Sequence, residues 1–158
     1  MLEVKNLTKI YPDGTLALKD VSFTVEDGEF LVIIGLSGSG KSTLLKNMSN
    51  HLESKSGVIY INNKKISEYS VAELAKTMAV VPQDTSVNYN FSVYDLVMMG
   101  RNPYQDYWGR IRSEDKEIVE ETMKLTDTYR FKDKKINQLS GGERQRVIIA
   151  RALAQEPE

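Results

Sequence analysis

The spacing of hydrophobic and polar positions changes near residue 84, and this change divides the expected elements into two groups. Before it, short apolar or alternating runs predict strands at 2–10, 21–25, 30–34, 57–61 and 78–81. Tyr11-Pro12-Asp13-Gly14 and Glu26-Asp27-Gly28 are typical of turns between such strands. The run at 30–34 is continuously apolar, which is typical of a buried strand.

Helical spacing dominates after residue 84. Ser92 is the expected N-cap of a helix that ends at Gly100, and Ser113 begins a second helix that runs to about Thr126. One side of the second helix carries the apolar or small residues Ile118, Val119, Thr122, Met123 and Leu125. A capping box at 70–73 predicts a short helix through Lys76, and 101–112 is expected to be a loop that contains Trp108.

A glycine-rich loop follows the run at 30–34 and leads into a helix. Residues 35–42 read G-L-S-G-S-G-K-S, which is the phosphate-binding loop of nucleoside triphosphatases. Glycines let backbone N–H groups approach a polyphosphate, and the helix N-terminus adds partial positive charge. Lys41 is expected to reach the β- and γ-phosphates, and the Ser42 hydroxyl to bind Mg²⁺. The alternative, a glycine-rich turn with no ligand, explains the flanking strand and helix less well. The expected nucleotide-binding residues of this segment are Gly35, Ser37, Gly38, Ser39, Gly40, Lys41, Ser42 and Thr43.

Composition narrows the classes of partner. The 158 residues are enough for one domain, and 21 basic against 22 acidic residues do not indicate a nucleic-acid binder. The chain has no cysteine, which excludes disulfides and thiol catalysis. No apolar run approaches a membrane span, and the first residues lack the apolar core of a signal peptide. We therefore expect any work at a membrane to be done from the side, through a partner.

A second motif lies downstream, at Leu139-Ser140-Gly141-Gly142-Glu143. Alone, Ser-Gly-Gly is also typical of a flexible turn before a helix. Together with the phosphate loop upstream, it makes the chain resemble the ATP-binding cassette (ABC) ATPases, whose signature is LSGGQ or LSGGE. The resemblance implies an α/β phosphate-loop cassette with an antiparallel β edge, a parallel nucleotide-binding core, here incomplete, and a helical subdomain. It divides the chain into 1–83 (antiparallel β and phosphate-loop core), 84–138 (helical subdomain) and 139–158 (signature and following helix).

The resemblance also implies roles for single residues, with ATP and Mg²⁺ as ligands. Tyr11 matches an aromatic that stacks on adenine, although an exposed turn tyrosine is the alternative. Gln83 matches a glutamine that touches Mg²⁺ or the attacking water and senses the membrane partner; a plain polar residue after a strand is its alternative. The signature, Ser140, Gly141, Gly142 and Glu143, is implied to close over the γ-phosphate held by a second subunit. Arg144 and Arg146 are expected on a solvated or dimer-facing side of the helix.

As a member of this family, the chain is expected to be the ATP-binding subunit of an importer, coupling ATP binding and hydrolysis to solute uptake. The implied partners are permease subunits, a second ATPase subunit in a homodimer and, indirectly, an extracytoplasmic solute-binding protein, with no nucleic acid. The implied location is peripheral, on the cytoplasmic face of the membrane.

The expected branch of the family is the importers of iron-siderophores, haem or cobalamin, because the resemblance implies that the helical region meets the membrane partner; a phosphonate or amino-acid importer is the alternative. Residues 97–104 and 113–115 resemble importers of iron-siderophores, haem and cobalamin, whereas 17–23 resembles phosphonate or amino-acid importers. A non-transport cassette of DNA repair, chromosome maintenance or translation is an alternative, disfavoured by the compact segment 84–138. A non-hydrolytic nucleotide-binding fragment is another.

The family pattern continues beyond the last residue, Glu158, with a strand ending in Asp and Glu and then a switch histidine. Neither carboxylate is found after Gly142 in such a run, and the single histidine, His51, is expected to be a surface residue. We therefore expect weak or absent hydrolysis by the chain as given. We also expect poor solubility and an exposed apolar patch on the last helix, around Val147, Ile148, Ile149 and Leu153.

Overall fold

The computed structural model describes residues 1–83, 90–105 and 109–158, so Trp108 lies outside the described residues. The chain forms two compact units: the sheet unit, Met1–Ser70, and the helical unit, Val71–Glu158. In the described ranges, none of the helices has both the length and the apolar content needed to cross a bilayer.

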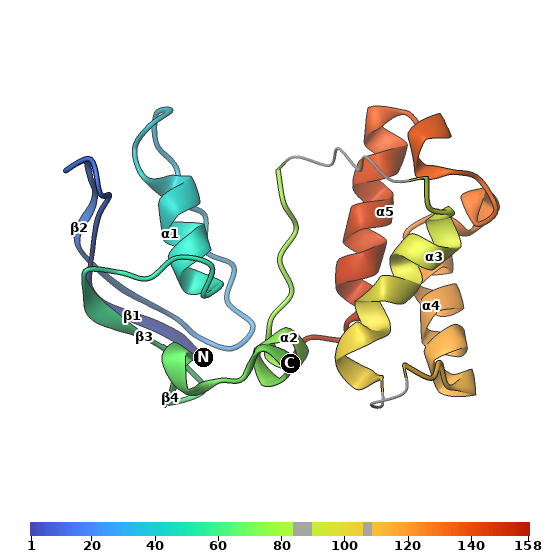
Figure 1. Ribbon diagram of the computed structural model, residues 1–158, viewed down its shortest axis with the longest axis horizontal. Coiled ribbons are helices and arrows are strands. Elements are labelled where there is room, and N and C mark those ends of the chain that lie inside the picture. The colour runs from blue at the N-terminus through green and yellow to red at the C-terminus, as the bar shows by residue number, and fades with distance from the viewer. Residues whose placement is uncertain (84–89, 106–108) are drawn as a thin grey trace. The chain divides into compact units, whose positions relative to one another are not determined.

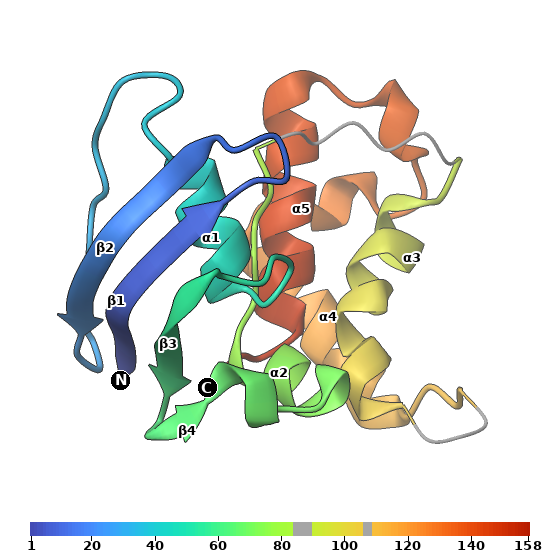
Figure 2. The same cartoon turned by 60° about the vertical axis from the view of Figure 1, so that its left-hand side comes forward.

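The sheet unit contains a four-stranded antiparallel sheet in the order β2-β1-β3-β4 (Figure 2). Its elements are β1 (Leu2–Ile10), β2 (Leu16–Val25), α1 (Lys41–Met48), β3 (Ser56–Ile61), β4 (Lys64–Lys65) and a 3-10 helix (Ile66–Glu68). The buried side chains of this sheet include Val4, Leu7, Leu18, Ile59 and Ile61. The strands expected at 2–10, 21–25 and 57–61 are therefore confirmed.

The turns between these strands follow from their residues. Gly14 N–H donates to Tyr11 O at 2.9 Å, which confirms the turn expected at 11–14. Asn62 and Asn63 join β3 to β4 with φ values of 49° and 64°. Two left-handed residues in a two-residue hairpin match the twist of the strands, and asparagine adopts this conformation more readily than most residues.

Two expected strands are wrong. The runs at 30–34 and 78–81 form no strand, and Phe30 and Ile34 are each 89% exposed. A parallel strand buried on both faces needs partner strands, and among the described residues no segment pairs with either run. The antiparallel part of the expected core is therefore present, and the parallel part has no counterpart in the described ranges.

The helical unit holds α2 (Val71–Thr77), α3 (Val93–Met98), α4 (Ser113–Leu125) and α5 (Gly141–Ala154), with 3-10 helices at Met99–Tyr104, Tyr129–Phe131 and Ile136–Gln138. Helices α3, α4 and α5 lie side by side (Figure 1). Their apolar faces and the segment before α5 form one buried cluster among the described residues: Val93, Leu96, Val97, Met98, Val119, Met123, Phe131, Ile136, Leu139, Val147, Ile148, Ala150 and Ala154. The expected helices at 71–76, 92–100 and 113–126, and the helix expected after the signature, are confirmed to within a few residues.

Some details of these helices differ from expectation. Gly100 does not end α3: the helix stops at Met98, and a 3-10 helix continues across the glycine. Leu125 is largely exposed, because it lies two positions after the buried Met123 and so points away from the core. On α5, Val147 and Ile148 are buried, and only Ile149 and Leu153 of the expected apolar patch are exposed.

Candidate nucleotide-binding site

The phosphate loop (residues 35–42) enters α1 through glycines in the left-handed region. Gly38 has φ 83°, and Gly40, the N-cap of α1, has φ 91°. A Cβ on Gly40 would lie 2.5 Å from the carbonyl oxygen of Ala17 in β2. Glycine is therefore required here twice, for the backbone conformation and for the close approach to β2. Leu44 N–H then donates to Gly40 O at 2.8 Å, closing the first turn of the helix.

The Lys41 side chain lies over the phosphate loop and points its ammonium group at loop residues. Its Nζ donates to Gly35 O at 2.8 Å, to Leu36 O at 2.6 Å and to Ser39 Oγ at 3.2 Å. Three separate loop residues thus accept from one charged donor. This arrangement holds a positive charge against the loop that the motif assigns to a polyphosphate.

Tyr11 lies beside the first turn of α1. Its hydroxyl shares a hydrogen bond of 3.1 Å with Thr43 Oγ1. Lys9 Nζ lies 5.7 Å from the centroid of the Tyr11 ring, within the range of a cation–π contact. The sheet unit therefore brings together Tyr11, Thr43 and the phosphate loop. Stacking of Tyr11 on adenine and Mg²⁺ binding by Ser42 stay predictions.

The start of α1 suits an anion. Within α1 itself, the first turn contains no acidic residue, and Gly40 provides no side-chain cap. By contrast, α3 and α5 have Ser92 and Ser140 as N-caps, whose hydroxyls accept from N–H groups of the first turn. The first N–H groups of a helix need acceptors, and a phosphate group can supply them. One ammonium, several hydroxyls and an uncapped helix start form a donor set that fits Mg²⁺ and a polyphosphate.

The signature lies in the helical unit and begins α5. Ser140 N–H and Ser140 Oγ both donate to Glu143 Oε2, at 2.8 and 2.7 Å, and Glu143 N–H donates back to Ser140 Oγ at 3.4 Å. The Ser140 hydroxyl and then its N–H lower the pKa of the Glu143 carboxyl. A Cβ on Gly141 or Gly142 would meet nothing within 4 Å among the described residues. Packing among the described residues of this unit therefore does not require glycine at these two positions.

The remaining expected site residues also lie in the helical unit. Gln83 is exposed and follows the run at 78–81. Its role in Mg²⁺ binding stays a prediction. Arg144 and Arg146 are less exposed than expected: the Nε atom of each is buried without a hydrogen-bond partner among the described residues. Arg144 Nη2 donates to Leu139 O at 3.3 Å.

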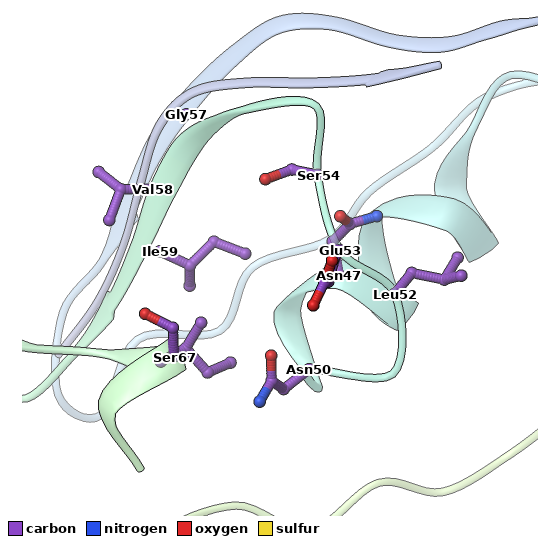
Figure 3. A pocket seen from close by; sticks show the side chains of 10 residues that line it. Asn47, Asn50, Leu52, Glu53, Ser54, Gly57, Val58, Ile59 and Ser67 are labelled. Atoms are coloured by element: carbon purple, nitrogen blue, oxygen red, sulfur yellow. The ribbon is translucent and has the colours of Figure 1, made fainter. Parts of the chain in front are cut away.

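Sequence reasoning missed a pocket of about 370 Å³ in the sheet unit (Figure 3). It lies between the C-terminal half of α1, β3 and the 3-10 helix at Ile66–Glu68, and none of the expected site residues lines it. Asn47, on its wall, is only 2% exposed. Its Nδ2 donates to Thr43 O at 2.7 Å, while its Oδ1 has no partner among the described residues. One buried asparagine in a helix gives no periodic signal that would have predicted this pocket.

Sequence reasoning also missed a buried ion pair in the helical unit. Arg101 Nε donates to Asp115 Oδ1 at 2.9 Å, and both side chains are almost inaccessible to solvent. In the sequence, the two residues stand out only as parts of segments that resemble one branch of importers. Their separation in sequence hides the contact.

The fold and the two motifs define a nucleotide-binding cassette, and comparison with known proteins identifies its family. The family model described as ABC transporter matches residues 18–158. The chain therefore belongs to the ABC transporter family, which confirms the resemblance in the sequence.

Characterised and uncharacterised relatives agree with this assignment. An uncharacterised ABC transporter ATP-binding protein of Methanocaldococcus jannaschii is 41% identical over 157 residues, 99% of this chain and 54% of that protein. The phosphonates import ATP-binding protein of Bdellovibrio bacteriovorus is 40% identical over 165 residues, covering 99% and 63%. The iron(3+)-hydroxamate import ATP-binding protein of Bacillus subtilis is 39% identical over 141 residues, covering 89% and 52%. The chain thus spans less than two thirds of the length of each of these relatives.

A solved structure shows the same fold. A dimeric bacterial ABC transporter cassette matches with a TM-score of 0.86 and 35% identity, over 99% of this chain and 71% of that chain. The expected cassette fold is therefore confirmed, with its antiparallel sheet and its helices.

Proposed function

We propose that this chain is an ATP-binding subunit of an ABC importer and that it binds ATP with Mg²⁺ at the start of α1. The observation that carries the proposal is the helix start itself, where Gly40 leaves the first N–H groups without a side-chain cap. Lys41 lies next to it with its ammonium turned onto the loop. An anion of several charges satisfies both groups at once.

Each residue has a distinct part in this proposal. The Lys41 ammonium exchanges the loop carbonyls for β- and γ-phosphate oxygens, and the Ser42 hydroxyl binds Mg²⁺. Tyr11 lies at the adenine end, held near α1 by its hydrogen bond to Thr43. Gln83 completes the Mg²⁺ ligands or orients a water.

The signature acts on a second copy of the chain. Gly141 and Gly142 are exposed, and their missing side chains leave the N-terminus of α5 open to a γ-phosphate held by that copy. Two copies then enclose two ATP molecules and act on permease subunits at the cytoplasmic face of the membrane. The names of the relatives support import as the process, and they include both iron-hydroxamate and phosphonate import. We favour a metal-chelate solute, because the helical residues 97–104 and 113–115 carry that resemblance.

Nucleotide binding tests the proposal most directly. The affinity for a fluorescent ATP analogue with Mg²⁺ is measured for the parent chain, Lys41→Ala and Lys46→Ala. Both variants remove one positive charge from α1, but Lys46 is exposed in the last turn, away from the loop. Losing hydrogen bonds from a charged donor is worth about 1.5–3 kcal/mol. We therefore expect Lys41→Ala to bind about 10–150 times more weakly and Lys46→Ala to bind like the parent.

Equal affinity in all three proteins would contradict the assigned site. Phosphate release in the same samples measures whether this chain hydrolyses ATP. Binding to purified permeases of an iron-hydroxamate importer and of a phosphonate importer tests the solute branch, and stronger binding to the phosphonate permease would overturn our choice.

A further inference from the structure

Arg101 makes several buried contacts that nucleotide binding does not explain. It lies in the 3-10 helix after α3 and is only 4% exposed. Besides the bond to Asp115, its Nη1 donates to Ala154 O and to Glu156 Oε2, both at 2.8 Å. The guanidinium also lies 4.1 Å from the ring centroid of Tyr104. One side chain therefore joins the segment after α3, the first turn of α4 and the C-terminal end of α5.

Other segments meet at the same end of α5. A Cβ on Gly100 would lie 2.4 Å from Arg151 O, so the 3-10 helix packs directly against the last turn of α5. Gln155, just after α5, donates through Nε2 to the carbonyl oxygens of Ala75 and Met78, the latter at 2.7 Å. These two bonds connect α5 with α2. The C-terminal end of α5 is thus held from several directions.

The chemistry of this end calls for arginine in particular. The last carbonyls of a helix carry partial negative charge, so a guanidinium beside Ala154 O is favoured there. The Asp115 carboxylate accepts from Arg101 and also from Arg112 N–H at 3.0 Å, where α4 begins. A planar guanidinium reaches separate acceptors in fixed directions, whereas the ammonium of lysine is a compact point charge.

We infer that Arg101 is a positioning residue that fixes the direction of α5 against α3 and α4, and thereby the direction in which the signature is presented. Helix α5 has 14 residues, a length of about 21 Å. A tilt of about 10° at its held end moves the signature by about 3–4 Å, more than the tolerance of a hydrogen bond. The positioning of α5 by Arg101 does not depend on the proposed function; only the contact between the signature and the nucleotide rests on it.

Distances between spin labels test the inference without nucleotide. The chain has no cysteine, so Glu121→Cys on α4 and Ile149→Cys on α5, both exposed positions, can be labelled without background. The parent background is expected to give a narrow distance distribution. Arg101→Lys, which keeps the charge, is expected to broaden or shift it by several ångströms at a temperature where circular dichroism shows a folded chain.

Two further variants sharpen this test. Arg130→Lys makes the same replacement in an exposed pair with Asp127 of the same unit and is expected to leave the distribution unchanged. Glu156→Gln weakens one ion pair of Arg101. The Glu156 side chain is 54% exposed, so we expect this variant to fold and to broaden the distance distribution less than Arg101→Lys does. If Arg101→Lys does not fold, Glu156→Gln decides the question. Unchanged distances in the folded variants would overturn the inference, since a residue that only adds stability does not move them.

Association gives the functional readout. With Mg²⁺ and ATP, we expect Arg101→Lys to keep the parent's ATP affinity within about twofold and to self-associate at least about tenfold more weakly. Equal association would overturn the link to the signature. The proposed function would be contradicted if the parent chain bound no ATP, or if it did not self-associate in the presence of ATP. In either case the distances between the spin labels would still decide the role of Arg101.

Discussion

The sheet unit and the helical unit use their apolar residues in different ways. In the described part of the helical unit, α3, α4, α5 and the segment before α5 bury thirteen apolar residues in one cluster. In the sheet unit, the apolar run at 30–34 and Leu36 remain exposed beside a well-ordered antiparallel sheet. A helix satisfies its own backbone hydrogen bonds and needs only neighbouring faces to cover its apolar side, whereas a central strand also needs partner strands for its backbone. A continuous apolar run therefore marks a surface suited to burial and does not by itself make a strand.

The sharpest test of this comparison replaces one large apolar residue in each region. Met123 is fully buried in the helical cluster, so Met123→Ala should lower the free energy of unfolding by about 2–5 kcal/mol. Phe30→Ala, in the exposed run, should change it by less than about 0.5 kcal/mol. Both changes in the free energy of unfolding are measured by urea denaturation, with hydrogen exchange of peptides from each unit as the probe. Similar losses for the two variants would show that the run at 30–34 is buried in solution.

A smaller loss is expected where the 3-10 helix after α3 packs against the last turn of α5. Gly100→Ala places a Cβ 2.4 Å from Arg151 O, so backbone must shift, which typically costs about 1–3 kcal/mol. Gly141→Ala is the matched control, because its Cβ would meet nothing within 4 Å among the described residues. The same denaturation experiment applies. A Gly100→Ala variant as stable as the parent would mean that α5 and the 3-10 helix can separate freely.

Acid should weaken the helical unit through Asp115. Burial alone raises the pKa of this carboxyl, but hydrogen bonds from Arg112 N–H and Arg101, with the charge of Arg101, hold the pKa below its usual value. As the pH falls, Asp115 is therefore protonated in the unfolded chain before it is protonated in the folded chain. The stabilisation is present above about pH 4 and is lost as the pH falls through the lower pKa of the folded state. Unfolding measured from pH 7 to pH 3 should show this loss in the parent and less of it in Asp115→Asn. Identical pH profiles would exclude Asp115 as the source.

The smallest effect should be a gain in the sheet unit. Asn47→Leu removes a buried Oδ1 without a partner among the described residues and fills part of the pocket beside it. We expect a stabilisation of about 1 kcal/mol, after the loss of the bond to Thr43 O. Lys46→Leu, at an exposed position of the same helix, should have almost no effect. A destabilised Asn47→Leu would indicate that the Oδ1 atom has a partner, such as an ordered water.

What the sequence could predict follows from how local each signal is. The helices and the antiparallel strands carry their spacing within one segment, and the phosphate loop carries its chemistry within eight residues. The hydrogen bond of Tyr11 to Thr43 places this ring beside α1, and the adenine contact that family resemblance implies stays a prediction. The contact of Arg101 with Asp115 and Ala154 joins residues 14 and 53 positions apart, with no periodicity to reveal it. The strand predictions at 30–34 and 78–81 are wrong because strand formation depends on partners outside the segment.

The reciprocal bonds between Ser140 and Glu143 make anion capture at the start of α5 an exchange. The serine hydroxyl already donates to a carboxylate, so a phosphate oxygen must displace one negative group to reach it. Replacing Glu143 by a phosphate oxygen at the Ser140 hydroxyl exchanges one charge-assisted hydrogen bond for another, so the net free energy of this replacement is small. A lone small anion in solution therefore competes poorly with Glu143. On the proposed function, a polyphosphate already held by a partner would have a high local concentration at this helix start and would complete the exchange, so the site would select a ligand presented by a partner.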